Sequence, residues 1–125
     1  MCPKAFAVFI ASRAGLTLVH TPDGFMIDYA LRDEETGDIE AWLNVICQDS
    51  QPSRDFLLSL AKWNSAIKLI RRIGKPFLLA YRFQNQDFVL QIQKENIPLV
   101  LLCENGSDAP FVRIPNKLFQ VLAYH

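Results

Sequence analysis

One histidine and one aspartate are the first residues in this sequence whose types and spacing could do chemistry. His20 ends the apolar segment LTLVH, and Asp28 interrupts the apolar segment FMIDYAL, with the turn residues 21–24 between them. In a β-hairpin with a three-residue loop, His20 faces Met26 and Asp28 lies diagonally from His20 on the same face. A carboxylate beside an imidazole can fix its tautomer and tune its pKa, as a general base requires. His20 and Asp28 are therefore the candidate catalytic residues.

The same two residues also have structural explanations, and the sequence favours these. With a two-residue loop, Asp28 pairs with Thr17, whose hydroxyl is the preferred hydrogen-bond donor for the carboxylate. Cys47 is the only nucleophile to consider, and it follows two β-branched residues, as core cysteines do. His20 then reads as a structural or surface histidine. Catalysis stays open, but its absence is the favoured prediction.

Charge is unevenly distributed along the chain, although it cancels overall. Residues 23–55 hold nine acidic side chains and two basic ones, whereas residues 56–86 hold six basic side chains and no acidic one. Opposite charges at the rim of an interface steer and orient partners. The predicted binding residues are Lys68, Arg71, Arg72, Lys75 and Arg82 on the basic side and Asp33, Glu34 and Glu35 on the acidic side.

Several classes of site have no support in the sequence. Three cysteines without a CxxC pair, and only two histidines, predict neither a disulfide framework nor a metal site. No glycine-rich loop precedes a helix, so no cofactor is predicted. No stretch is long enough to span a membrane. Cys47 and Cys103 follow apolar residues and suit buried thiols, which favours a reducing compartment, and we expect a cytoplasmic protein.

The strongest periodic pattern predicts one long amphipathic helix over Ser53–Ile73. Its apolar stripe has alternating steps of four and three residues, and it consists of Phe56, Leu60, Trp63, Ile67 and Ile70. Ser53 is expected to cap the first turn, and Gly74 to end the helix in a left-handed conformation. The cations of the last turns complement the helix dipole.

The remaining segments read mostly as strands. Residues 3–14 fit a helix or a buried strand, with a slight preference for the helix, and residues 39–47 are assigned as a strand. Phe77–Phe83 and Phe88–Gln93 predict a hairpin, and Leu99–Cys103 a central strand covered on both sides. Residues 111–114 are a further strand, and 116–124 remain helix or strand. The expected fold is α+β, a single domain over residues 1–125, with an antiparallel sheet of about five to seven strands packed on one long central amphipathic helix.

These patterns lead to one favoured function and two alternatives. The favoured one is a small intracellular protein-interaction module without catalysis, whose partner is another protein or a second copy of the chain. The half-apolar second face of the Phe77–Gln93 hairpin is the reason for considering a homodimer. One alternative is a small-molecule-binding or enzymatic domain that uses His20 and Asp28, with a cavity between sheet and helix lined by Phe25, Tyr29, Trp42, Tyr81 and Phe83. The other is nucleic-acid binding through the basic helix end, with Trp63 or Tyr81 stacking on bases, and it is not favoured.

Overall fold

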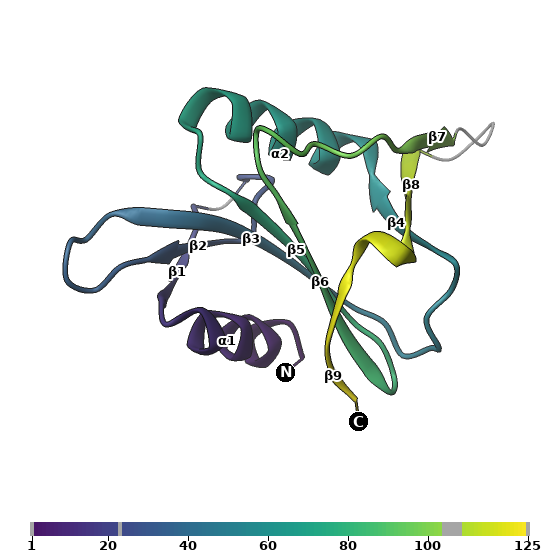
Figure 1. The fold of residues 1–125 in the computed structure, drawn as a ribbon, viewed down its shortest axis with the longest axis horizontal. Helices are drawn as coiled ribbons and strands as arrows, with labels where there is room; N and C mark the ends of the chain where they lie inside the picture. Colours follow the sequence, from purple (N-terminus) through teal and green to yellow (C-terminus); the bar gives the residue numbers. More distant parts are fainter. Residues whose placement is uncertain (1, 23, 104–108, 125) are drawn as a thin grey trace.

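The computed structural model describes residues 2–22, 24–103 and 109–124. Within these residues, two α-helices, a 3₁₀ turn and nine strands follow one another (Figure 1). In chain order they are α1 (Cys2–Ala14), β1 (Thr17–His20), β2 (Tyr29–Arg32), β3 (Ile39–Cys47), β4 (Asp55–Ser59), α2 (Leu60–Ile73), β5 (Phe77–Arg82), β6 (Gln86–Ile92), β7 (Leu101–Cys103), β8 (Phe111–Pro115), η1 (Asn116–Leu118) and β9 (Gln120–Tyr124).

The strands form two sheets. The main sheet has six strands in the order β1-β2-β3-β5-β6-β9, and the small sheet has three in the order β4-β8-β7. All neighbouring pairs are antiparallel except β3 and β5, which run parallel. A parallel pair needs a crossover connection, and here β4 and α2 provide it. The predicted all-antiparallel sheet is therefore wrong in this one pair, and the fold is a mixed α/β fold with two helices.

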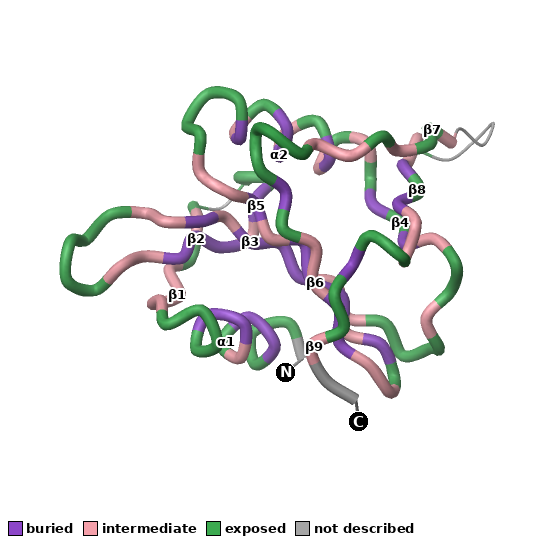
Figure 2. The backbone as a smooth tube through the Cα atoms, viewed as in Figure 1, coloured by how far each residue is buried: buried purple, intermediate pink, exposed green. Residues whose placement is uncertain are grey.

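The two helices lie on opposite faces of the main sheet (Figure 1). On one face, Phe6, Ala7 and Ile10 of α1 pack against buried residues of β2 and β3, which include Leu31 and Leu43. Figure 2 shows that α1 is buried along one side and exposed along the other. Helix α1 confirms the helical choice for residues 3–14, and β3 confirms the strand over residues 39–47.

On the other face, α2 and the small sheet enclose the larger core. Phe56 of β4 lies at its centre, with its ring centroid 4.7–5.1 Å from the rings of four other aromatic side chains, those of Tyr81, Phe83, Phe88 and Phe119. The predicted Phe77–Gln93 hairpin is confirmed, with Phe77 opposite Ile92 and Tyr81 opposite Phe88. Its shared apolar face lies in this core.

Helix α2 begins seven residues later than the periodicity predicts. Residues 55–59 form β4, in which Phe56 and Leu58 are buried while Leu57 and Ser59 are exposed, a period of two rather than 3.6. Ser59, not Ser53, caps the helix, because its hydroxyl accepts a hydrogen bond from the Lys62 amide at 3.2 Å. Gly74 ends the helix at φ 80°, as predicted. Phe56 fits both the apolar stripe of a helix and the buried face of β4. The stripe alone therefore could not distinguish helix from strand at this residue.

Two further strand predictions change in the structure. The segment predicted to be a covered central strand yields β7, an edge strand of the small sheet whose Leu101 and Leu102 are exposed. The alternatives for residues 116–124 both contain part of the answer, because the 3₁₀ turn η1 is followed by strand β9. β9 pairs with β6 and is an edge strand of the main sheet.

Candidate functional site

The connection between β1 and β2 is longer than either hairpin expected from the sequence. His20 pairs with Tyr29, so eight residues, 21–28, join the two strands. Both predicted registers are therefore wrong, and Asp28 precedes β2 instead of lying on it. Asp23 lies outside the described residues.

Asn44 fixes this loop against β3. Its side chain is fully buried, its Oδ1 accepts a hydrogen bond from the Asp28 amide at 2.6 Å, and its Nδ2 donates to the Met26 carbonyl oxygen at 3.4 Å. The Asp28 carboxylate also accepts from the Val45 amide at 3.2 Å. Val45 rather than the preferred Thr17 is thus a hydrogen-bond donor to Asp28. The signal for Asn44 was available, since it is the only polar residue in the strand segment AWLNVI.

A second set of hydrogen bonds closes the loop on itself. The Thr21 hydroxyl donates to the carbonyl oxygens of Ile27 and Asp28, and the Phe25 amide donates to the Pro22 carbonyl oxygen at 3.2 Å. Ile27 is buried in the core beneath α2. The loop is therefore anchored at both ends, and Phe25 projects from a supported backbone.

His20, Asp28 and Lys62 line one surface pocket of about 400 Å³. Three elements supply them: the end of β1, the residue before β2 and the first turn of α2. The His20 ring lies 4.9 Å from the Tyr29 ring, and burial together with the negative charge of Asp28 raises the pKa of Tyr29. The structure thus brings the two predicted catalytic residues together and adds Lys62, which the sequence reasoning did not select.

The pocket combines a basic, an acidic and an imidazole side chain. A lysine can stabilise a phosphoryl oxygen, a histidine can transfer a proton near neutral pH, and a carboxylate can orient either group. β1 ends at His20, and Asp28 lies beside the carboxyl-terminal half of β3.

The cations of α2 follow the pocket along the helix. Lys68, Arg71 and Arg72 are exposed, and Lys75 is half-buried just after the helix end. Within the described part of the chain, none of these four side chains forms an ion pair with a carboxylate. Lys68 and Arg72 line a second cavity against loop residues 24–27, and with Arg71 they line a third along α2. Their charge is available to a ligand.

Arg82 does not belong to this group, although the sequence reasoning placed it there. Its guanidinium donates to both carboxylate oxygens of the fully buried Asp87, at 2.9 Å each, and lies 4.5 Å from the centroid of the Phe6 ring. The hydrogen bond to Asp87 raises the pKa of Arg82. Because Phe6 belongs to α1, Arg82 serves the opposite face of the sheet and contributes to structure.

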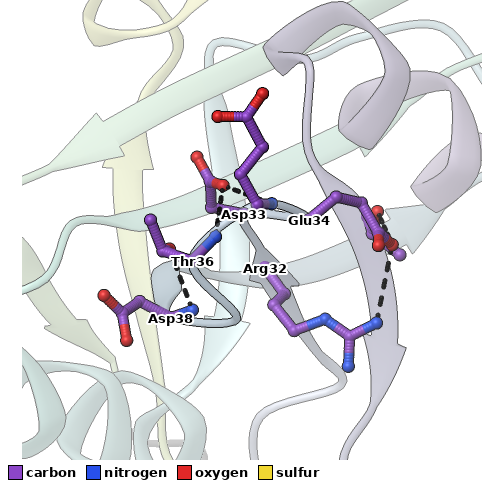
Figure 3. Close-up of polar contacts among 7 residues, drawn as sticks. Arg32, Asp33, Glu34, Thr36 and Asp38 are labelled. Atoms are coloured by element: carbon purple, nitrogen blue, oxygen red, sulfur yellow. Dashed lines mark hydrogen bonds and ion pairs between the residues drawn. The ribbon is translucent and has the colours of Figure 1, made fainter.

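The predicted acidic binding residues form a self-contained turn between β2 and β3 (Figure 3). One carboxylate oxygen of Asp33 accepts hydrogen bonds from the amides of Glu35 and Thr36 at 2.8 and 3.1 Å. Glu34 lies 3.5 Å from the Arg32 guanidinium and accepts from the Thr17 hydroxyl at 2.5 Å. The carboxylates of Asp33 and Glu34 thus have partners in the turn, in Arg32 of β2 and in Thr17 of the neighbouring strand β1.

Three further findings concern metal ligands, membrane-spanning helices and cysteines. Among residues 2–22, 24–103 and 109–124, no three His, Cys, Asp or Glu side chains are grouped as metal ligands would be. No helix in the same part of the chain is long and apolar enough to cross a membrane. Cys103 is free, but Cys47 is half-buried and disulfide-bonded, so it no longer supports the argument from buried thiols.

The predicted aromatic cavity between sheet and helix is divided in the structure. Tyr81 and Phe83 are buried in the core, whereas Phe25 and Tyr29 line the pocket of His20 and Asp28. Trp63 is also buried, so neither Trp63 nor Tyr81 could stack on a base. On the second face of the hairpin from residue 77 to 93, Ala80 is buried against α1 and Leu78 and Val89 are partly buried beside it, so α1 covers part of this face.

Comparison with known proteins identifies a similar fold. No protein-family model and no curated protein sequence matches this chain. Among solved structures, the fold is similar to that of Hjc from Archaeoglobus fulgidus, a Holliday junction resolvase from an archaeal hyperthermophile. The TM-score is 0.53 at 13% sequence identity, and the match covers 92% of this chain and 88% of the resolvase. This finding overturns the protein-interaction module without catalysis that the charge pattern favoured, because the scaffold is similar to that of an enzyme acting on nucleic acid.

Proposed function

We propose that this chain binds and processes nucleic acid, and that it holds the sugar-phosphate backbone along the outer face of α2. The observation that carries the proposal is the row of exposed cations on α2, which lacks carboxylate partners in the described residues. Exposed lysines and arginines that neutralise phosphates release counterions, and this release provides much of the affinity for nucleic acid. The similarity in fold to a Holliday junction resolvase supports the same proposal.

The spacing of the cations suits a polyanion. Lys62, Lys68 and Arg72 all line cavities on the side of α2 that faces the loop 21–28. Ten residues of helix from Lys62 to Arg72 correspond to about 15 Å at ~1.5 Å per residue. One strand of duplex DNA advances ~3.4 Å per phosphate along its axis, so this row would follow about four phosphates.

The test is a direct binding measurement with a charge-matched control. Fluorescence anisotropy would report the affinity of the chain for labelled single-stranded, duplex and four-way-junction DNA. The triple variant Lys68→Glu, Arg71→Glu, Arg72→Glu should lose at least about a hundredfold in affinity, because it reverses the charge of the contact row. The control variant Arg54→Glu, Lys94→Glu, Lys117→Glu changes net charge equally at exposed positions outside α2. It should lose less than about tenfold.

Two results would remove the proposal. The first is that the wild-type chain binds none of the three DNA forms at low salt. The second is that both triple variants lose affinity equally, because binding would then reflect net charge and no particular surface. The control variant should keep the thermal midpoint of the wild type, whereas the midpoint of the α2 variant should fall by a few degrees, because Glu at positions 71 and 72 opposes the helix dipole. Binding is therefore compared at a temperature where both variants are folded.

A second candidate function is cleavage of a phosphodiester bond, and the grouping of His20, Asp28 and Lys62 in one pocket favours it. Labelled junction and single-stranded DNA would be incubated with Mg²⁺ and resolved by length. We expect shorter products from the wild type and at least about a hundredfold slower cleavage by Asp28→Asn and Lys62→Gln. Equal cleavage by the wild type and by both variants would exclude this pocket as the site of cleavage.

A further inference from the structure

A groove between the loop 21–28 and α2 combines apolar and positive side chains. Phe25, Met26 and Ile27 line one wall, and Ser65, Lys68, Leu69 and Arg72 line the other, around a cavity of about 300 Å³. Phe25 is 46% exposed and Met26 43% exposed. Large apolar side chains that remain exposed beside a cavity commonly mark a binding site. Among the described residues, no acidic side chain lines this groove.

Phe25 has a particular place in this arrangement. It lines both the groove and the pocket of His20, Asp28 and Lys62, and so it separates the two. Its ring meets Trp42 at a centroid distance of 6.3 Å and an angle of 69°, an edge-to-face geometry that supports the ring from below. The backbone around it is held by the hydrogen bonds of Thr21 and Asn44. A base that stacked here would meet a pre-positioned ring.

We propose that Phe25 stacks on an unpaired base of a bound nucleic acid while Lys68 and Arg72 hold the flanking phosphates. This inference rests on the proposed function and deepens it, because it assigns the bound form as single-stranded or locally unpaired. Aromatic side chains beside a positively charged groove are the usual platform for single strands, since every base has a face that can stack. Trp63 and Tyr81 are buried, which leaves Phe25 as the one aromatic residue among the exposed large hydrophobic side chains of the described structure.

A nucleic acid fits this groove better than a second copy of the chain does. A symmetric dimer formed through Phe25 would bring Lys68 and Arg72 of both copies toward one another, and like charges at an interface are unfavourable. A polyanion with apolar bases instead complements both the cations and the exposed ring. Charge complementarity therefore selects the occupant.

The experiment compares matched variants at residue 25 on unpaired and paired DNA. Phe25→Leu keeps an apolar side chain but lacks an aromatic face, and we expect it to lose about tenfold or more in affinity for single-stranded DNA. Phe25→Tyr keeps the face and should bind as the wild type does. Neither variant should change the affinity for blunt duplex DNA by more than about twofold. A strand that carries 5-iodouracil should crosslink on irradiation to residue 25 of the wild type, as mapped by mass spectrometry.

Each contrary outcome has a separate meaning. If the wild type binds DNA but Phe25→Leu binds single strands equally well and no crosslink reaches residue 25, the stacking inference fails and the proposed function stands. If the wild type binds no DNA, both fail. If sedimentation shows that the wild type dimerises and Phe25→Leu does not, the groove is a self-association surface, and the inference is overturned.

Discussion

On the α1 face of the main sheet, Arg82 is bound by the buried carboxylate of Asp87 and lies over the ring of Phe6. On the α2 face, Lys68, Arg71 and Arg72 are exposed and have no carboxylate partner among the described residues. A cation that leaves water needs a partner, because the cost of desolvation is otherwise uncompensated, whereas a solvated cation needs none. The charge at Arg82 is therefore explained by folding. The charges of α2 form no such pair within the described part of the chain: Arg71 and Arg72 complement the helix dipole, and they remain available to the ligand that we propose.

The largest effect is expected where this comparison is sharpest, at Asp87. Asp87→Ala removes the partner of a guanidinium that is only about a quarter exposed, and it should lower the free energy of unfolding by about 3 kcal/mol. Urea denaturation followed by tryptophan fluorescence would measure this. DNA affinity of the folded fraction should not change.

A double variant sharpens the interpretation at the same place. If Asp87→Leu is combined with Arg82→Leu, no guanidinium is left without its carboxylate, and much of the lost stability should return. If the double variant is instead less stable than Asp87→Ala, the two side chains stabilise the fold by more than compensating each other's charge. The comparison between the two faces would then not rest on charge alone.

The cations of α2 should give the opposite pattern of results. Lys68→Gln and Arg72→Gln should each reduce the slope of log affinity against log salt by about one, because each removes one phosphate contact. The free energy of unfolding should change by less than about 0.5 kcal/mol. Anisotropy titrations between 50 and 200 mM salt would measure the slope. If the slope is unchanged and the free energy of unfolding falls, these side chains contribute to the fold, as Arg82 does, and not to binding.

A smaller effect is expected at Tyr81, in the core beneath α2. Its hydroxyl donates to the Leu57 carbonyl oxygen at 2.6 Å, and Tyr81→Phe should cost about 1 kcal/mol. Burial raises the pKa of Tyr81 above its ordinary value of 10.0. The folded chain thus keeps this proton when the unfolded chain has lost it, so the wild type loses stability as pH rises above 10. Tyr81→Phe should lose less across that range in urea titrations, and an equal loss would assign the alkaline sensitivity elsewhere.

The smallest effect is expected at the exposed acidic turn. The Thr17 hydroxyl and, to a lesser degree, the charge of Arg32 lower the pKa of Glu34 from its ordinary value of 4.5. Its stabilising contribution is therefore present above pH 4.5 and is lost as the pH falls through the lowered value. Glu34→Gln should flatten the acid limb of the stability profile only slightly, because the group is exposed and screened. A change in DNA affinity on this substitution would bring the turn back into the binding surface.

The sequence by itself determined those parts of the molecule that depend on local patterns. Residues 3–14 and 39–47 took the predicted helix and strand, and the hairpin from Phe77 buries the face that alternation selected. Gly74 ended α2 because a left-handed residue there suits glycine. His20 and Asp28 were selected as a pair and do line one pocket, though not through the register that was expected.

The tertiary structure decided everything that depends on which distant residues meet. It paired β3 with β5 in parallel, and it placed the buried Asn44 side chain where it accepts a hydrogen bond from the Asp28 amide, 16 residues away in the sequence. It also placed Lys62 and Asp28 in the lining of one pocket. The separation of Arg82 from the cations of α2 has the same origin, because β5 directs successive side chains to opposite faces of the sheet and Arg82 falls on the face of α1. Local periodicity records which face of an element is apolar, but it contains no information about the element against which that face will pack.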